Sequence, residues 1–258
     1  MKKPLYNALS AVFAGCCVLV FSIALLASGK GKGQNCCESL SVAFSDSYNF
    51  VNEEDIKSCL DRNYGPYVGQ RLDSVDLYRI EEILDAQSAV LKSEAYTTPD
   101  GRLNVIISQR EPAVRFQKGG QGFYADNRGM LFPLQSKYTS NVPVVDGAVP
   151  LAWSAGYKGE PQSDQEKRWL GGLLSLLSWV ENSKQWSGAI VQMNVNQDGD
   201  LVLVPRYGSE KFIFGYPDEI AAKFGRIEKY YQYIRPSKGE DYYSTVNVKF
   251  DGQIVCRK

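Results

Sequence analysis

The chain has 258 residues, and its 29 basic and 29 acidic side chains give a formal net charge of zero. This balance excludes the clustered positive charge with which proteins usually bind nucleic acid. The chain has no histidine, which excludes Ser-His-Asp and Cys-His catalysis and histidine-ligated zinc. The motifs G-x-S-x-G, S-x-x-K, the P-loop and G-x-G-x-x-G are also missing.

Paired carboxylates are the remaining candidates for acid–base catalysis. The chain has acidic runs at Glu53-Glu54-Asp55, Glu81-Glu82 and Glu240-Asp241. Each run is better explained by structure, as a helix start, a helix face and a loop in that order. We therefore expect no enzyme activity, no catalytic or metal-ligating residues and no cofactor.

The first feature along the chain is an apolar stretch at residues 5–27, which follows Lys2 and Lys3. At about 1.5 Å per residue, a helix of this length crosses a hydrocarbon core of roughly 30 Å. The two lysines favour a cytoplasmic location for the short end. The sequence therefore predicts a single transmembrane helix, with the long C-terminal part outside the cytoplasm.

A cleaved signal peptide is the alternative, because the small residues Ala27-Ser28-Gly29 follow the apolar stretch. The stretch is long for a signal peptide and lacks an A-x-A pattern at its end. A lipoprotein signal at Cys36 or Cys37 is disfavoured, because polar residues 33–35 separate these cysteines from the apolar stretch.

The cysteines beyond the anchor would lie in an oxidising space. They are Cys36, Cys37, Cys59 and Cys256. They are too few and too scattered for a disulfide scaffold, and one bridge or four reduced thiols both remain open. The absence of C-x-x-C argues against a zinc or redox motif.

The region after the linker begins with a half-buried strand, in which Leu40, Val42 and Phe44 alternate with small or polar residues. A helix is predicted after Asn52, and a second at about residues 72–84, capped by Asp73 or Asp76. Two strands follow, at residues 90–97 and 102–109. This order predicts a small sheet with two helices packed on one face.

The remaining residues are rich in turns and short strands. Ser163 and Glu166 form a capping box that opens a helix, and Asp218 is predicted to cap another helix at residues 219–234. Strands are predicted at residues 122–126, 130–133, 142–145, 189–195, 200–204, 211–214, 245–250 and 253–257. The fold class is therefore α+β, and this second region is a mixed sheet with two longer helices.

Five segments, in this order and spacing, resemble the FtsQ/DivIB family of bacterial cell-division proteins, especially its Bacteroidetes forms. The segments are residues 50–56, 68–72 with 77–84, 105–112, 122–129, and 246–250 with 253–255. Gln109-Arg110-Glu111-Pro112 is similar to the family's strand-ending R-x-P element. The terminal V-D-L-R-Y element differs here, with Asn247, Lys249 and Phe250 in place of its Asp, Arg and Tyr.

The resemblance implies a POTRA domain of β-α-α-β-β order followed by a β-domain. The expected division is a cytoplasmic tail at residues 1–4, a transmembrane helix at 5–28, a linker at 29–37, the POTRA domain at 38–112 and the β-domain at 113–258. It also implies a non-catalytic divisome scaffold in the inner membrane, located at the septum. Such a scaffold binds FtsB- and FtsL-like proteins in the periplasm and links them to septal peptidoglycan synthesis.

We expect the partner to bind at the C-terminal strands, because a terminal strand often lies at a sheet edge and can accept another strand. The candidate residues are Val248, Lys249, Phe250, Gln253, Ile254, Val255 and Cys256. Ordinary core-facing roles are the alternative for the individual side chains. Family analogy alone points to further division proteins at the POTRA domain, near Asn52, Glu54 and Arg79, where a solvated face is the simpler interpretation.

Two other functions remain as alternatives. The first is another POTRA-bearing envelope assembly or secretion component, although such proteins carry several POTRA repeats or a long barrel. The second is a membrane-anchored cell-wall enzyme, which the absence of histidine and S-x-x-K disfavours.

Overall fold

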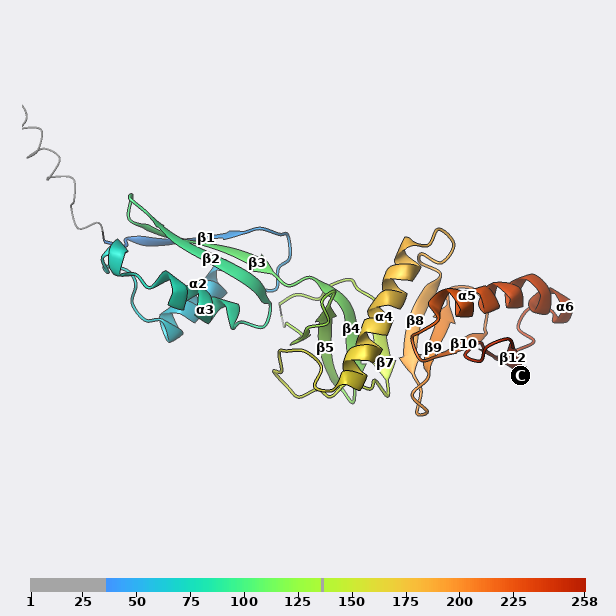
Figure 1. Cartoon of the computed structure of the whole chain (residues 1–258). Coiled ribbons are helices and arrows are strands. Elements are labelled where there is room, and N and C mark those ends of the chain that lie inside the picture. Colours follow the sequence, from blue (N-terminus) through green and yellow to red (C-terminus); the bar gives the residue numbers. More distant parts are fainter. Residues whose placement is uncertain (1–35, 136) are drawn as a thin grey trace, which may run out of the picture.

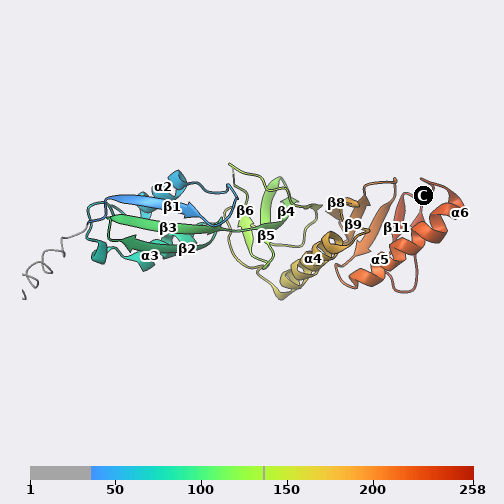
Figure 2. The same cartoon turned by 90° about the horizontal axis from the view of Figure 1, so that it is seen from above.

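The computed structural model describes residues 36–135 and 137–258. The transmembrane helix expected at residues 5–28 and most of the expected linker lie outside this part of the chain. Within the described residues, no helix has the length and apolar character needed to cross a membrane. Figure 1 and Figure 2 show the described elements in a row, from β1 at one end to β12 and the C-terminus at the other.

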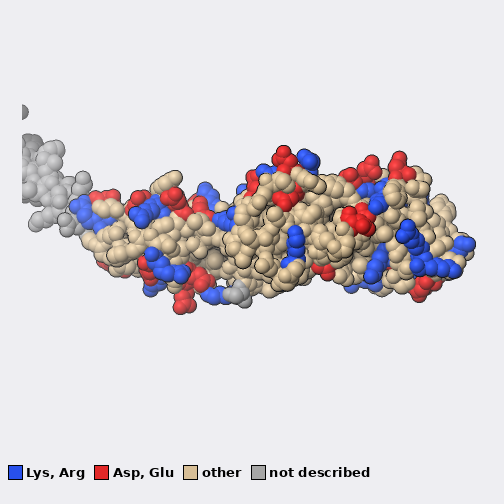
Figure 3. Space-filling model, turned by 90° about the horizontal axis from the view of Figure 1, so that it is seen from below, with Lys and Arg blue, Asp and Glu red and all other residues tan. Residues whose placement is uncertain are grey.

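The described residues form a three-stranded sheet followed by a nine-stranded sheet. We call each sheet with its helices the three-stranded unit and the nine-stranded unit. Basic and acidic side chains are interspersed over the face of the molecule shown in Figure 3, so that face has no large field of one sign.

The three-stranded unit has the predicted strand-helix-helix-strand-strand order. Its elements are β1 (Ser39–Phe44), α2 (Glu53–Asn63), the short 3-10 helix η1 (Leu72–Ser74), α3 (Leu77–Asp85), β2 (Val90–Thr98) and β3 (Arg102–Gln109). The strand order is β1-β3-β2, with β1 parallel and β2 antiparallel to β3. The core between the helices and the sheet includes Ile56, Leu60, Ile80 and Leu84.

The predicted helix caps explain where the first two helices begin. The side chain of Asn52 accepts a hydrogen bond from the backbone N–H of Asp55, whose carboxylate accepts one from the N–H of Asn52. Of the two candidates for the second helix, Asp76 forms the cap by accepting from the N–H of Arg79. The second helix therefore begins at Leu77, and residues 72–74 form only a 3-10 turn.

The nine-stranded unit contains the mixed sheet. Its strands are β4 (Pro112–Lys118), β5 (Gln121–Asp126), β6 (Leu131–Pro133), β7 (Val144–Gly147), β8 (Ile190–Val195), β9 (Leu201–Pro205), β10 (Lys211–Gly215), β11 (Thr245–Asn247) and β12 (Val255–Arg257). Their order across the sheet is β12-β11-β10-β9-β8-β7-β4-β5-β6. The pairs β4–β7, β7–β8 and β10–β11 are parallel, and the others are antiparallel.

Helices cover one face of this sheet, as Figure 2 shows for α4 (Asp164–Asn182) and α5 (Ile220–Lys229). A π-helical turn (Tyr230–Ile234), labelled η2, and α6 (Arg235–Lys238) follow α5 directly. The buried face of α4 carries Trp169, Leu170, Leu173, Leu176, Leu177 and Val180. Its predicted capping box is confirmed, because Ser163 Oγ accepts from the N–H of Glu166 and Glu166 accepts from the N–H of Ser163.

The predicted cap at Asp218 is wrong. Helix α5 begins at Ile220, directly after Glu219, which has a left-handed backbone with φ of 45°. Asp218 lies one residue too early to cap the helix, and its carboxylate instead accepts a hydrogen bond from Lys223 Nζ. The N-cap residue makes no side-chain capping bond.

The two units meet through a small apolar cluster and a buried ion pair. Phe50 and Ala89 of the three-stranded unit pack with Tyr124 and Phe132 of the nine-stranded unit. Arg110, which follows β3, places its Nη1 atom 2.6 Å from Asp126 Oδ2, and both side chains are less than a tenth exposed.

A lysine from the nine-stranded unit strengthens the same junction. Lys158 Nζ donates to the backbone oxygens of Asp85 and Gln87, at 2.6 and 2.8 Å, where α3 ends. Cations stabilise the carbonyl end of a helix. Burial, and the charge of Arg110 after it, lower the pKa of Lys158. The junction therefore combines apolar packing with directed polar contacts.

Candidate partner-binding edge

The C-terminal strand β12 lies at one edge of the nine-stranded sheet. Its neighbour in the sheet is β11, with pairs Thr245↔Arg257, Val246↔Cys256 and Asn247↔Val255. No strand of the described residues pairs with its other side. Unpaired backbone groups of this kind can accept a strand from another chain.

The opposite edge of the sheet, at β6, is covered by another segment of the chain. Leu131 of β6 donates its N–H to the oxygen of Gly159 at 2.8 Å, and the N–H of Gly159 donates to the oxygen of Leu131 at 3.0 Å. The segment around Gly159 therefore caps the β6 edge. Among the described residues, β12 has no equivalent cap.

The segment between β11 and β12 is a turn and not an extension of both strands. The prediction of strands at residues 245–250 and 253–257 is therefore too long, because β11 ends at Asn247 and β12 begins at Val255. The cause is Asn247, whose Oδ1 accepts a hydrogen bond from the N–H of Lys249 at 3.0 Å. A side-chain bond of this kind replaces the ladder bonds of a strand.

The candidate binding residues have different surroundings. Val248 is fully buried, whereas Phe250 is 44 % exposed. Gln253 is also exposed. The half-buried Ile254 and Cys256 pack against the core beneath the sheet. Burial raises the pKa of the Cys256 thiol, which disfavours the reactive thiolate.

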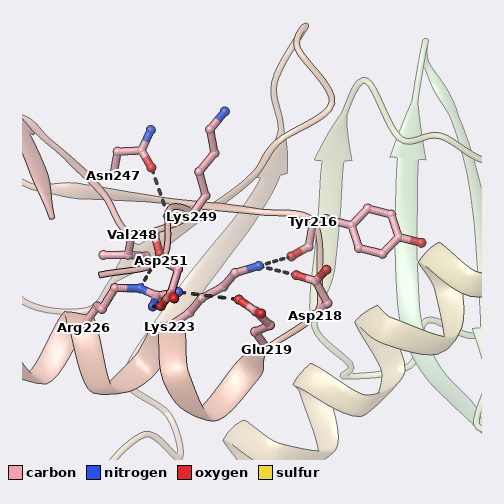
Figure 4. Close-up of polar contacts among 9 residues, drawn as sticks. All are labelled: Tyr216, Asp218, Glu219, Lys223, Arg226, Asn247, Val248, Lys249 and Asp251. Carbon is pink, nitrogen blue, oxygen red and sulfur yellow. Dashed lines mark hydrogen bonds and ion pairs between the residues drawn. The ribbon is translucent and has the colours of Figure 1, made fainter. Parts of the chain in front are cut away.

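Arg226 of α5 holds this turn in place, as Figure 4 shows. Its Nε donates to the backbone oxygen of Val248 at 2.8 Å, and its Nη1 lies 3.2 Å from Asp251 Oδ1. The Arg226 side chain is 9 % exposed. Because the guanidinium is buried, its bond to Val248 fixes the end of β11 relative to the helix.

Lys223, one helical turn before Arg226, fixes the loop that leads into α5. Its Nζ donates to the backbone oxygen of Tyr216 at 2.7 Å and to the carboxylate of Asp218. The same ammonium group lies 5.0 Å from the centre of the Phe214 ring, within the range of a cation–π contact. The buried lysine therefore ties β10, the loop and the helix together.

Lys249 is tied to the sheet by an ion pair. Its Nζ lies 2.7 Å from Asp200 Oδ2, next to β9. Its stem lies over Gly215, where an added Cβ atom would come within 2.7 Å of the Lys249 Cβ. The lysine charge is thus already engaged in the structure.

Sequence reasoning missed Lys223 and Arg226 as supports of this site. A signal was present, because Lys223 lies three residues after Ile220 and one before Phe224, on the face of the helix that should be apolar. A cation at such a position requires a buried partner. The sequence did not identify the partner, because the Tyr216 and Val248 carbonyl groups are backbone atoms.

The acidic runs and the cysteines are the other residues that could have carried chemistry. Glu53, Glu54 and Asp55 lie in the first turn of α2, and Glu81 accepts a hydrogen bond from the N–H of Ala95. In the described part of the chain, no group of three His, Cys, Asp or Glu residues is placed to hold a metal ion. There, Cys36, Cys37, Cys59 and Cys256 are free thiols.

Comparison with known proteins identifies both units. Residues 35–108 match a model of the POTRA-like domain, and residues 111–257 match the model described as FtsQ/DivIB, C-terminal related. No curated protein matches the chain. The second match covers more than half of the chain and ends within β12, so the resemblance seen in the sequence is confirmed. The chain is a POTRA-bearing member of the FtsQ/DivIB-related family.

Proposed function

We propose that this protein is a non-catalytic scaffold of the cell-division machinery. It is anchored in the inner membrane by residues 5–28, and its body lies in the periplasm. There it binds FtsB- and FtsL-like proteins and links them to septal peptidoglycan synthesis. The observation that supports this proposal most is the uncapped β12 edge at the end of the region that matches the family.

Binding occurs by strand addition at β12. An extended segment of the partner forms main-chain hydrogen bonds with the outer side of Val255–Arg257, which supply affinity. The exposed ring of Phe250 and the side chain of Gln253 contact the partner beside the strand. Val248 contributes indirectly, because it belongs to the buried core that supports the β12 edge.

The polar supports of the turn reduce the cost of binding. Arg226 holds the Val248 carbonyl and Lys249 pairs with Asp200, so the turn before β12 is already ordered. A preorganised surface loses less conformational freedom when a partner binds. No chemical step is required of any side chain at this site.

A pull-down with matched variants tests the proposal. The full chain in detergent micelles is incubated with the FtsB- and FtsL-like proteins of the same cell. Phe250→Glu should abolish their recovery without changing the melting temperature. The control Tyr207→Glu, at a site that is 79 % exposed between β9 and β10, should leave recovery unchanged. Normal recovery with folded Phe250→Glu and Ile254→Lys variants would remove this edge from the interface.

Localisation separates the proposed function from other envelope roles. A fluorescent fusion of the full chain should collect at midcell during septation. An even distribution around the envelope would contradict the divisome function and favour another POTRA-bearing assembly component.

A further inference from the structure

The nine-stranded sheet has a second opening, where β7 and β8 separate. Their pairing begins at Val145↔Met193 and continues to Gly147↔Val195. Residues 190–192 of β8 precede the first of these pairs, and in the described chain their strand pairing is with β9. The segment before β7 instead follows β4, because the N–H of Arg115 donates to the oxygen of Pro143 at 2.9 Å.

This separation opens into a notch of about 840 Å³, which is lined by the two strands and α4 and also by the start of β4 and the segment before β7. Where the two strands begin to pair, Asp146 of β7 links them, because its Oδ1 accepts from Asn194 Nδ2 at 2.6 Å and its Oδ2 from Gln192 Nε2 at 3.1 Å. Leu174 and Leu177 of α4 line the notch from above. The two strands that border the opening are therefore joined by side-chain hydrogen bonds where their pairing begins.

The walls of the notch carry both polar and apolar groups, and three of the apolar residues are exposed. Val144 on β7 is 45 % exposed, and Val191 on β8 is 51 % exposed. Pro143 lines the same opening and is also exposed. A strand edge with exposed valines invites pairing unless a charge protects it. Among the described lining residues, no lysine or arginine provides such protection.

The charged groups that line the notch are acidic. Glu111 directly precedes β4 and Glu181 lies near the end of α4, and no other charged side chain of the described residues lines the notch. Burial, and after it the nearby Glu111 carboxylate, raise the pKa of Tyr48 to about 12. An incoming basic side chain would meet two carboxylates, and an acidic one would be repelled.

We propose that this notch is a second docking site, for an extended segment of a partner protein that has apolar side chains at alternate positions and carries lysine or arginine. The segment adds to the free side of β8 at residues 190–192. Its apolar side chains contact Val144 and Val191, and its cation pairs with Glu181 or Glu111. The site is separate from the proposed edge, because β9, β10 and β11 lie between β8 and β12.

The test uses labelled peptides and the full chain in nanodiscs of a zwitterionic lipid, which does not attract basic peptides. The first probe has about six residues, a usual strand length, and alternates valine and lysine. The second has glutamate in place of lysine. The third is the valine–lysine peptide with N-methyl groups on alternate backbone nitrogens, which removes donors for strand pairing. Binding is measured by fluorescence anisotropy.

The valine–lysine probe should bind, and the other two should not. Glu181→Lys should weaken binding about fivefold, the upper value for one exposed charge pair, and Val191→Lys should weaken it further. The matched controls Glu82→Lys and Val68→Lys, at exposed sites of the three-stranded unit, should bind like the unaltered chain. Phe250→Glu should also bind normally, which separates this site from the β12 edge.

Three results would overturn the proposal. The first is no binding of the valine–lysine probe to the unaltered chain. The second is equal binding to the Glu181→Lys and Val191→Lys variants, with unchanged melting temperatures. The third is equal binding of the N-methylated probe, which would exclude strand addition.

Discussion

Arg226 Nε donates a hydrogen bond to the backbone oxygen of Val248 across 2.8 Å. The two residues belong to α5 and to the turn that follows β11, and they are 22 positions apart in the chain. The bond joins the helix that covers the sheet to the strand that supports the β12 edge. It therefore connects the packing of the core with the proposed partner-binding surface.

Arg226→Ala should destabilise the protein and weaken partner binding together. The change removes the donor to the buried Val248 oxygen, and a lost hydrogen bond of this kind costs about 2 kcal/mol. Urea unfolding gives the stability, and partner pull-down gives the binding. Lys229→Ala, at an exposed position of the same helix, is the control and should change neither. Unchanged partner binding by folded Arg226→Ala would show that the turn does not need this support.

Arg110→Ala should destabilise the junction between the two units. It leaves the buried carboxylate of Asp126 without its cation, which typically costs about 3–5 kcal/mol. Arg102→Ala breaks an exposed pair with Asp100 and should cost less than about 1 kcal/mol. The free energies of unfolding of both variants, measured with urea, test this difference. Similar values for the two would mean that the buried pair contributes no more than a surface pair.

Alanine substitutions at two adjacent glycines of α4 should change the stability of the protein in opposite directions. At Gly172 an added Cβ atom would lie 2.3 Å from the Pro217 oxygen, whereas at Gly171 it would meet open space. Gly172→Ala should therefore lower stability by about 1–3 kcal/mol through overpacking. Gly171→Ala should raise stability by up to about 1 kcal/mol, because alanine favours a helix. Thermal melts would contradict this account if both variants were stabilised.

Stability should fall at alkaline pH through the ionisation of buried tyrosine. Burial, followed by the charge of Glu210, raises the pKa of Tyr230 from 10 to about 12. The folded state then holds the proton more tightly than the unfolded state, so this contribution is complete below pH 10 and is lost as the pH rises to about 12. Tyr230→Phe should flatten the fall in melting temperature over this range, whereas the exposed control Tyr78→Phe should not. An identical fall in the Tyr230→Phe variant would exclude this tyrosine as the cause.

Local signals in the sequence predicted much of the fold. The capping groups of Asn52 and Ser163 act on neighbouring backbone atoms, so their effect can be read from a few residues. Strand β4 was not predicted, although Val114 and Phe116 are buried in it and alternate with Arg115 and Gln117. The resemblance placed Pro112 in an element that ends the preceding strand, whereas Pro112 opens β4, a position that proline tolerates.

The details of the candidate site depended on contacts that the sequence does not reveal. Asn247 ends β11 by a local bond, yet the same residue type also occurs within strands. The burial of Arg226 depends on a carbonyl group that is distant in the chain. The sequence located the terminal strands, but the turn between them and its supports follow from the tertiary structure.

Hydrogen–deuterium exchange of the full chain with and without its FtsB-like partner tests strand addition at β12 most directly. New main-chain hydrogen bonds protect amide groups from exchange. The account predicts slower exchange at residues 253–257 when the partner is bound. Unchanged exchange at these residues, with protection elsewhere in the nine-stranded unit, would contradict binding at this edge.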